Sequence, residues 1–328
     1  MLRLIYRPAE GAPQELEPAR LAACLAEPGG LVWLDLCGEP EAEARALLEA
    51  HFDFHPLAID DALAERHVPR VDDWEGYLYL VAHAVAADAN PSAGGVETRE
   101  LDVFLGRGYL VTHHEQPIGL VDEVWSASLR DPRWLRHGTP RLLYHLLDAL
   151  AEGYLGGLEA LALRLEGLED AIFADSAPRD LERILDAKRA LLTLRRVLAP
   201  QREVLNKLAR HDFAVVETAD LVYFRDVYDH LARAYEMNES LRDLSGSVIE
   251  TYLSLVNNRM NDVMKTLTVI TTLFMPIGFL AGFFGMNFFA PPATTMPGMG
   301  ALSRSLVLAL MLVTPLGMLW WMRRRRLI

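Results

Sequence analysis

The sequence has almost no cysteine and lacks the short motifs of the common enzyme classes. Cys24 and Cys37 are its only cysteines, and neither belongs to a CxxC pair, so we expect neither a disulfide framework nor a cysteine zinc site. No P-loop lysine motif, GxSxG or HExxH occurs in the 328 residues. We therefore predict that the chain is not an enzyme, carries no organic cofactor and does not itself hydrolyse ATP.

The chain also lacks a long apolar run at its N-terminus and acidic residues towards its C-terminus. The opening MLRLIYRPAEGAPQELE turns polar after six residues, so we do not expect it to be a signal peptide. Residues 1–265 hold all 45 acids and 27 of the 32 basic residues, a formal net charge of −18. Such an acidic surface is not expected to bind nucleic acid, because phosphates need basic residues, but it suits the gathering of cations.

Residues 266–303 contain no charged residue. Their first part, TLTVITTLFMPIGFLAGFF, is long enough to cross a bilayer as a helix, and Ser305–Met322 is a second candidate at the short end of the range. Glycines and prolines between the two segments break helical structure. The pattern therefore predicts a hairpin of two membrane-spanning helices.

Basic residues flank the predicted hairpin on one side. Arg259 and Lys265 precede the first span and four arginines follow the second, whereas only Arg304 lies near the connecting loop. The positive-inside rule therefore places both termini in the cytoplasm and the loop outside. The alternative interpretation is a buried helical hairpin in a soluble protein.

The residues before the predicted spans show two patterns. Short apolar or β-branched runs bounded by Gly, Pro, Asp or Asn predict strands and a mixed α/β fold. These strands lie at 2–7, 30–36, 77–85, 100–106 and 108–114, with a helix at 39–52. From residue 141 onward, Leu at three- and four-residue spacing predicts long helices. We expect one over 141–174, one over 176–212 with a break near Pro200, and one from about Val216 that continues into the first span.

One face of the first predicted span carries small, polar and methionine residues. They recur at steps of three or four, as one stripe of an α-helix requires: Asn261, Met264, Leu267 or Thr268, Thr271, Met275, Gly278 and Gly282. The stripe has no acid, whereas a bare divalent ion needs several oxygen ligands, so it suits an ion that keeps its water shell. Conduction would require several copies around an axis. The alternative is that the glycines and threonines pack helices together.

The tripeptide GMN at 285–287 follows the first span, and a second span and a basic C-terminus follow it. This arrangement resembles the CorA family of divalent-cation transporters. Four further segments are similar to the family's N-terminal signature, stalk and pore helix, so the resemblance covers essentially the whole chain. They are HPLAIDDAL (55–63), PRVDDWEGYLYLV (69–81), YFRDVYDH (223–230) and NDVMKTLTVITTLFMPIGFLAGFFGMNF (261–288).

The resemblance implies an α+β membrane protein that assembles as a funnel-shaped homopentamer in the lipid bilayer of the inner membrane. We expect the following parts: a cytoplasmic α/β domain at 1–130, a cytoplasmic helical hairpin at 131–215, a stalk helix at 216–265, a pore-lining transmembrane helix at 266–287, a periplasmic loop at 288–303, a second transmembrane helix at 304–322 and a basic cytoplasmic tail at 323–328.

The resemblance also implies roles for particular residues. Gly285, Met286 and Asn287 would form the selectivity filter, with Asn287 binding a hydrated ion at the outer mouth, and the stripe residues fall at pore positions. Asp226 falls at the acidic site that binds regulatory metal between subunits. Divalent cations (Mg²⁺, Zn²⁺, Co²⁺ or Ni²⁺) would then be both substrate and regulator.

The four terminal arginines have two interpretations. The resemblance implies that Arg323, Arg324, Arg325 and Arg326 form a basic collar around the inner mouth of the pore. The alternative is that they only set topology and anchor the helix to lipid headgroups.

The chain departs from the family pattern at two places. The family often has an acid after the MP of the outer loop, where this chain has Gly298, and it usually has a pore hydroxyl where this chain has Gly278. Both departures bear on ion preference. A ZntB-like zinc transporter, with or without coupling to protons, is therefore one alternative. A membrane-anchored metal sensor or scaffold that does not conduct is another.

Histidine and acid clusters elsewhere offer further metal-site hypotheses. His51 and His55 are four residues apart, but Pro56 disfavours helix at His55. His113 and His114 end a predicted strand, so their side chains should point to opposite faces. His230 follows the stalk motif, where either metal sensing or packing is expected. A solvated helix face accounts for the acids at 169, 170 and 175.

Overall fold

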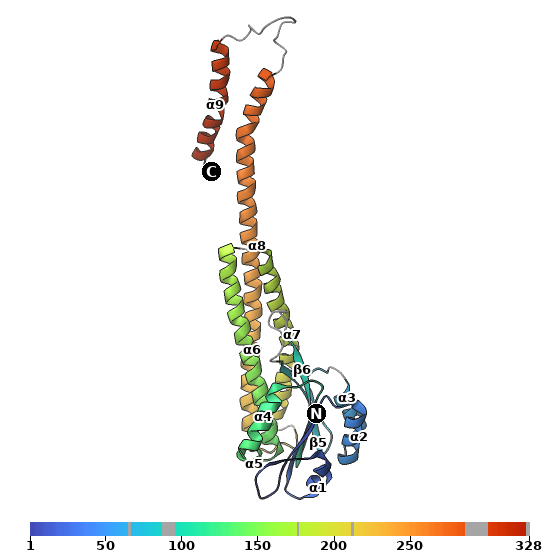
Figure 1. Ribbon diagram of the computed structural model, residues 1–328. Helices are drawn as coiled ribbons and strands as arrows, with labels where there is room; N and C mark the ends of the chain where they lie inside the picture. The colour runs from blue at the N-terminus through green and yellow to red at the C-terminus, as the bar shows by residue number, and fades with distance from the viewer. Residues whose placement is uncertain (65–66, 87–95, 176, 211–212, 286–300, 326–328) are drawn as a thin grey trace. The chain divides into compact units, whose positions relative to one another are not determined.

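The computed structural model describes residues 1–64, 67–86, 96–175, 177–210, 213–285 and 301–325. Contacts between Cα atoms divide the chain into two compact units, Met1–Glu250 and Thr251–Ile328. The first unit contains a sheet and long helices, and the second contains the C-terminal part of one long helix and a shorter helix (Figure 1).

The first unit is built on a seven-stranded sheet in the order β2-β1-β3-β7-β6-β5-β4. Its strands are β1 Leu2–Arg7, β2 Gln14–Leu16, β3 Leu31–Cys37, β4 Arg70–Asp73, β5 Tyr77–Val85, β6 Thr98–Gly106 and β7 Tyr109–His114. The β3–β7 pair is parallel and every other pair is antiparallel. The mixed α/β fold expected for this part of the chain is confirmed, and all five predicted strands are present.

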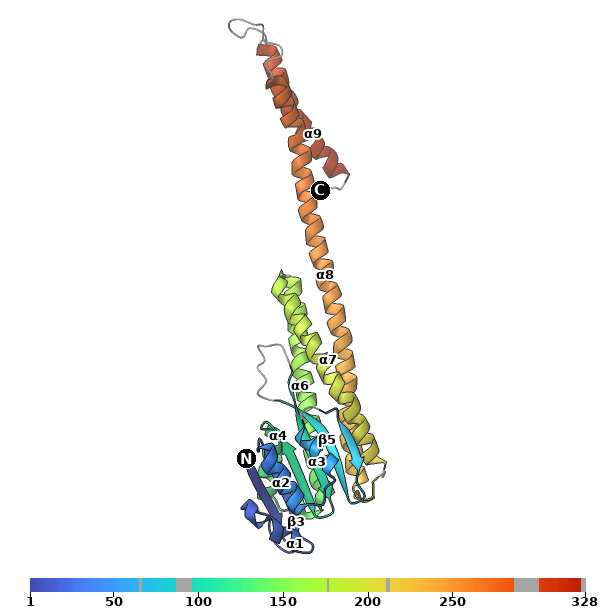
Figure 2. The same cartoon turned by 90° about the vertical axis from the view of Figure 1, so that its right-hand side faces the viewer.

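Small helices cover one face of the sheet (Figure 2). They are η1 Pro18–Arg20, α1 Leu21–Ala26, α2 Glu41–His51 and α3 Pro56–Leu63. Leu48 of α2 and Ile59 of α3 are buried in one apolar cluster with Leu34, Phe104 and Val111 of the strands. Removing this surface from water supplies the main stabilisation of the sheet, at about 25 cal/mol per Å² of apolar area.

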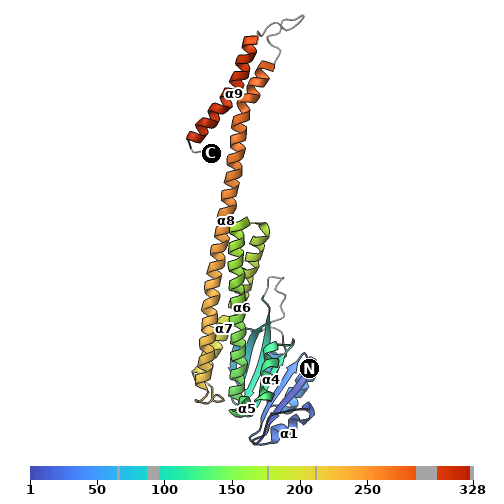
Figure 3. The same cartoon turned by 60° about the vertical axis from the view of Figure 1, so that its left-hand side comes forward.

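The remaining helices of the first unit are longer. They are α4 Gly119–Arg130, the short α5 Arg133–Arg136, α6 Thr139–Asp175, α7 Pro178–Ala209 and the start of α8 Leu221–Gly285. Helix α6 packs on β5, β6 and β7, and α7 packs on β4 and β5. Figure 3 shows α6 and α7 as an antiparallel pair, with the first part of α8 beside them. The predicted helix at 141–174 is therefore confirmed as α6.

The predicted break near Pro200 is wrong, because α7 continues through it. Proline removes one backbone hydrogen bond and crowds the preceding turn, at a cost of about 3 kcal/mol in a helix interior. Pro200 itself is only partly covered, whereas Leu194 and Leu198 before it and Leu205 after it are fully buried. Burial of this face on both sides of the proline offsets the lost bond and keeps the helix continuous.

The third long helix begins at Leu221 rather than near Val216. The residues between are held in turns, in which the Val216 amide donates to the Phe213 carbonyl and the Asp220 amide donates to the Glu217 carbonyl. The Asp220 carbonyl then accepts the first helical hydrogen bonds, and its buried carboxylate pairs with Arg141 of α6 at 3.2 Å. This ion pair ties the start of α8 to α6.

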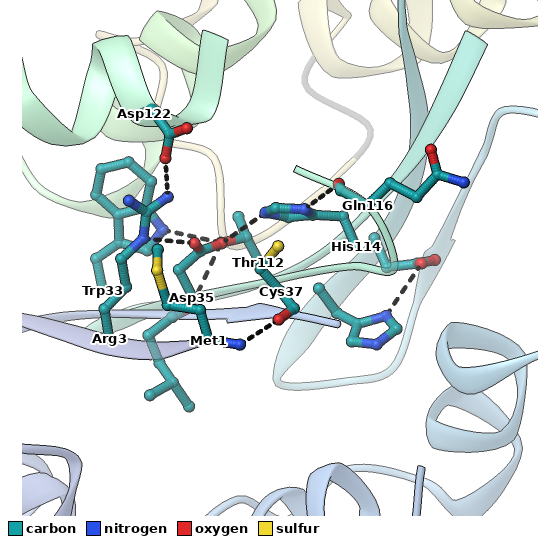
Figure 4. A network of polar contacts seen from close by, with 12 residues as sticks. Met1, Arg3, Trp33, Asp35, Cys37, Thr112, His114, Gln116 and Asp122 are labelled. Carbon is teal, nitrogen blue, oxygen red and sulfur yellow. Dashed lines mark hydrogen bonds and ion pairs between the residues drawn. The ribbon is translucent and has the colours of Figure 1, made fainter. Parts of the chain in front are cut away.

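A buried carboxylate links the sheet to α4 (Figure 4). Asp35 of β3 is fully buried and accepts hydrogen bonds from Arg3 Nε at 2.7 Å and Thr112 Oγ1 at 2.5 Å. His114 Nε2 lies 3.3 Å from the Asp35 carboxylate, and Arg3 also pairs with Asp122 of α4 at 2.6 Å. The network therefore joins β1, β3, β7 and α4.

The partners of Asp35 determine its ionisation. Burial alone would raise the pKa of the Asp35 carboxyl, but hydrogen bonds and charge from His114, Thr112 and Arg3 outweigh burial and hold the pKa below its ordinary value. A carboxyl whose pKa is lowered on folding stabilises the protein above its unfolded pKa, and that stability is lost as the pH falls through the folded value.

Asp35→Asn should lower the local stability of the sheet by about 3–5 kcal/mol at neutral pH, because Arg3 and His114 lose a buried partner. Hydrogen exchange of the β3 amides in the full chain measures this loss. The difference from wild type should shrink below pH 3.8, the ordinary pKa of the group. Asp53→Asn, at an exposed position, is the matched control, and equal β3 protection in both variants would contradict the assignment.

Candidate metal site and pore helix

Three possible metal ligands meet where α6 and α8 lie side by side. Asp226 and His230 are one turn apart on α8, so their side chains share a helix face. Asp148 of α6 lies opposite, with its Oδ1 3.1 Å from Nδ1 of His230. The possible ligand atoms of these three residues all lie within 4.8 Å of one another. Asp226 is exposed and the other two are partly buried, so the cluster is open to solvent.

The negative charge of this cluster acts on its surroundings. The pKa of Tyr144, one turn before Asp148 on α6, is raised first by burial and then by the charges of Asp148 and Asp226. A cation between the two carboxylates would relieve this charge. Carboxylate oxygens suit Mg²⁺, and the imidazole of His230 suits Zn²⁺, Co²⁺ or Ni²⁺.

The sequence analysis named Asp226 and His230 but missed Asp148. Asp148 precedes His230 by 82 residues, so no local spacing connects them, and only the packing of α6 on α8 brings them together.

The predicted pore stripe lies entirely on α8 and on an uncovered face. Each of its residues is exposed in the isolated chain: Asn261, Met264, Leu267, Thr268, Thr271, Met275, Gly278 and Gly282. The partly covered positions of this part of α8 are 269, 272, 273, 276, 277 and 280. Because successive residues of an α-helix are about 100° apart, these positions lie roughly on the side opposite to the stripe. The second helix of this unit, α9 Ala301–Arg324, stands beside α8 in Figures 1 and 3.

The glycines of the stripe have open space in front of them. A Cβ added at Gly278 or Gly282 would meet no heavy atom within 4 Å among the described residues. The hydroxyls of Thr268 and Thr271 donate to carbonyls one turn earlier, at 2.7 and 2.9 Å. Within one described chain, these residues therefore do not pack against a second helix, and the face is free for other copies.

Among the described residues, α8 is the one helix long and apolar enough to cross a membrane, and the most apolar part of it is not buried. The second predicted span, 304–322, falls on α9, which is helical over 24 residues. Proline 315 lies inside it, and several side chains near its start are outside the described residues.

Most of the predicted filter falls outside the described residues. Gly285 is the last residue of α8, whereas Met286, Asn287 and the loop to residue 300 are not described. Of the predicted basic collar, Arg323 and Arg324 end α9, and Arg325 follows it in a turn. Arg326 is outside the described residues.

The histidine pairs behave as the sequence analysis expected. His55 is extended and caps α3, with its Nδ1 accepting from the Leu57 amide at 3.2 Å, while His51 ends α2. The two residues therefore do not share a helix. On β7, His114 approaches Asp35 at 3.3 Å whereas His113 approaches Asp102 at 3.7 Å. Adjacent histidines thus meet different carboxylates.

The chain is similar to known metal ion transporters over nearly its whole length. The family model described as CorA-like Mg²⁺ transporter protein matches residues 28–324. YfjQ of Bacillus subtilis is 33% identical over 290 residues, covering 88% of this chain and 87% of that protein. The cobalt/magnesium transport protein CorA of Thermotoga maritima is 32% identical over 258 residues, covering 78% and 73%.

A solved structure shares the fold. The complete structure of the CorA magnesium transporter from Methanocaldococcus jannaschii superposes with a TM-score of 0.82 at 26% identity. The match covers 98% of this chain and 97% of that one. It therefore includes α8 and α9 as well as the sheet.

Asp148→Asn should weaken divalent-cation binding at the α6–α8 cluster by about 10–100-fold, because it removes one carboxylate and the group that orients His230. Calorimetric titration of the full chain in detergent with Mg²⁺ and with Co²⁺ measures the change. Asp170→Asn, at an exposed position of the same helix, is the control. If both variants bind as wild type does, Asp148 is not part of a metal site.

Proposed function

The chain belongs to the CorA family of divalent metal ion transporters, and on this premise we propose that it is a homopentameric channel for a hydrated divalent cation, with Mg²⁺ as the first candidate. The observation that carries the proposal is the exposed, acid-free stripe on α8. A family of transporters, rather than of enzymes, is also consistent with the motifs that the sequence lacks.

An acid-free stripe favours a hydrated ion. Stripping the water from Mg²⁺ is costly, and its sites in proteins usually retain several waters. Amide, hydroxyl and backbone groups can contact such a shell. Methionine and leucine side chains from the five subunits, arranged in rings around the axis, can close the path by excluding water. In the proposed pentamer, five copies of α8 would turn the face from Asn261 to Gly282 towards a common axis.

The proposed topology follows from charge. With both termini in the cytoplasm, Arg259 and Lys265 and the terminal arginines lie on the inner side of the inner membrane. The membrane potential then drives a divalent ion inwards with about 4.6 kcal/mol per 100 mV, twice the value for one charge. No further energy source is needed for uptake.

We assign regulation to the cluster of Asp148, Asp226 and His230. A bound cytoplasmic cation would neutralise the two carboxylates and hold α6 and α8 together, and the family resemblance adds a contact with a neighbouring subunit. When the metal leaves, the acids repel one another and the helix bearing the pore stripe loosens. Transport would thus stop once the cytoplasm holds enough of its own substrate.

One observation favours zinc as an alternative substrate. The imidazole of His230 is part of the metal cluster, and imidazole prefers Zn²⁺, Co²⁺ and Ni²⁺ over Mg²⁺. Flux measured ion by ion, with and without a pH gradient, separates the two cases. A magnesium channel should be indifferent to the gradient, whereas a proton-coupled zinc carrier should depend on it.

Asn287→Ala should abolish flux of Mg²⁺, Co²⁺, Ni²⁺ or Zn²⁺ into liposomes that hold a metal-sensitive dye, because the proposed filter loses its amide. Asn257→Ala, an exposed amide on α8 before the stripe, is the matched control and should conduct normally. Unchanged flux in Asn287→Ala would remove it from the filter, and no flux in wild type would favour a non-conducting sensor or scaffold.

Asp226→Lys should relieve inhibition by internal metal, because the lysine removes one metal ligand and its charge repels the cation from the cluster. Flux should then persist at internal metal concentrations that close the wild-type channel. Asp243→Lys, at an exposed position further along α8, controls for added charge. The same dependence on internal metal in wild type and Asp226→Lys would exclude Asp226 from the sensor.

A further inference from the structure

A second group of metal-ligating side chains lines a pocket in the first unit. The pocket has a volume of about 370 Å³ and lies where β5, β6 and β7 meet the end of α3. Four carboxylates line it, from Glu97, Glu100, Asp102 and Glu115, together with the imidazoles of His83 and His113. It shares no residue with the α6–α8 cluster.

Two of these side chains face each other across paired strands. Asp102 of β6 is the register partner of His113 of β7, and they are only 3% and 6% exposed. Oδ2 of Asp102 lies 3.7 Å from Nδ1 of His113, beyond hydrogen-bond distance. Among the described residues, this buried Nδ1 has no hydrogen-bond partner. Both residues line the same pocket.

The surroundings orient the carboxylate towards the imidazole. The hydroxyl of Tyr79 donates to Oδ1 of Asp102 at 2.6 Å, which leaves Oδ2 on the side of His113. Burial, the largest effect, raises the pKa of Asp102 to about 6, with a further increase from the charge of Glu100, although the nearby imidazole of His113 and the hydrogen bond from Tyr79 lower it. Asp35, which has the guanidinium of Arg3 as partner, shows the opposite shift. Asp102 is thus a buried carboxylate that accepts a hydrogen bond from a tyrosine hydroxyl and lies beside an imidazole, whereas Asp35 is paired with a guanidinium.

A second set of contacts fixes the wall of the pocket beside this pair. Glu100 lies two residues before Asp102 and therefore on the same face of β6. Its carboxylate accepts from the His67 amide at 2.6 Å and lies 3.1 Å from the His67 ring. His83 Nε2 donates to the His67 carbonyl at 2.6 Å and lies 3.9 Å from Glu100. These contacts hold a further carboxylate next to the Asp102–His113 pair.

We propose that this pocket binds one divalent transition-metal ion of the Zn²⁺, Co²⁺ and Ni²⁺ class, with Oδ2 of Asp102 and Nδ1 of His113 as its protein ligands. Ligands at about 2.0–2.1 Å from a tetrahedral ion lie roughly 3.3–3.4 Å apart, so the observed 3.7 Å needs to close by only a few tenths of an ångström. Water fills the remaining positions, for which the pocket has room. The ion supplies the charge that Asp102 lacks.

The ligand set also determines which ions bind. Neutral imidazole and carboxylate together favour Co²⁺, Ni²⁺ and Zn²⁺, whereas Mg²⁺ prefers an octahedral shell of oxygens. The hydroxyl of Tyr79 donates a hydrogen bond to the proposed ligand Asp102. Loss of such a hydrogen bond to a metal ligand typically weakens metal binding by about 10–100-fold. The site should therefore bind transition-metal ions selectively in the presence of Mg²⁺. This binding does not depend on whether the chain conducts ions.

Equilibrium dialysis of the full chain in detergent against Co²⁺ tests the proposal, with visible absorption of bound Co²⁺ as a second measurement. All variants carry Asp226→Lys, which disables the α6–α8 cluster. This background should bind one Co²⁺ that a hundredfold excess of Mg²⁺ does not displace. Asp102→Asn and His113→Gln should each lose this ion or bind it at least tenfold more weakly, and Tyr79→Phe should bind it about 10–100-fold more weakly.

His137→Gln, an exposed histidine outside both sites, is the matched control and should keep the ion. Circular dichroism checks that each variant folds. Asp102→Asn decides the outcome if His113→Gln does not fold, because it removes a buried charge and keeps the side-chain shape. Equal Co²⁺ binding in the background and in Asp102→Asn, or displacement by Mg²⁺, would overturn the proposal. The outcome of the flux measurements on Asn287→Ala does not affect this Co²⁺-binding result.

Discussion

A carboxylate that is withdrawn from water, or that lies close to a second carboxylate, is stabilised by a positive partner, and the chain meets this requirement in different ways at different places. Asp35 receives its partner from the protein itself, through Arg3, and so stabilises the sheet at neutral pH. The possible ligand atoms of Asp148, the exposed Asp226 and His230 lie within 4.8 Å of one another, and the buried Asp102 has a tyrosine and a histidine beside it. At the last two places, a bound metal ion would supply the positive charge. The acidic composition of residues 1–265 thus acts at specific sites as well as over the whole surface.

Helix α8 connects the metal cluster to the proposed pore. The cluster residues lie in its first turns and the stripe residues lie further along the same uninterrupted helix. A shift or rotation imposed where α8 meets α6 can therefore reach the stripe without passing through a loop. Gly246 lies between the two regions, and a Cβ added there would meet no heavy atom within 4 Å among the described residues, while glycine lowers helix stability by about 1 kcal/mol relative to alanine.

Local sequence patterns predicted the strands and helices whose formation depends mainly on their own residues. The five strands of the central sheet are apolar runs between turn-forming residues, and the structure has all of them. The edge strands β2 and β4 were missed because QEL and RVDD are short and largely polar, and backbone pairing alone defines them. Pro200 was misjudged because tertiary burial overrides its local cost. Pairs such as Asp148–His230 and Asp102–His113 depend on helix packing and strand register, which no sequence spacing reveals. For the filter, the prediction rests on family resemblance, since Asn287 lies outside the described residues.

The central claim is that occupancy of the cluster formed by Asp148, Asp226 and His230 closes the channel. The most direct test raises the internal free metal concentration in liposomes and measures two quantities. The first is metal bound at the cluster, taken as the difference between wild type and Asp148→Asn. The second is ion flux through the wild-type chain in the same liposomes. We predict that the curves coincide, with half-maximal flux at half occupancy. A channel that closes while the cluster is still empty, or that conducts fully when the cluster is filled, would contradict the account.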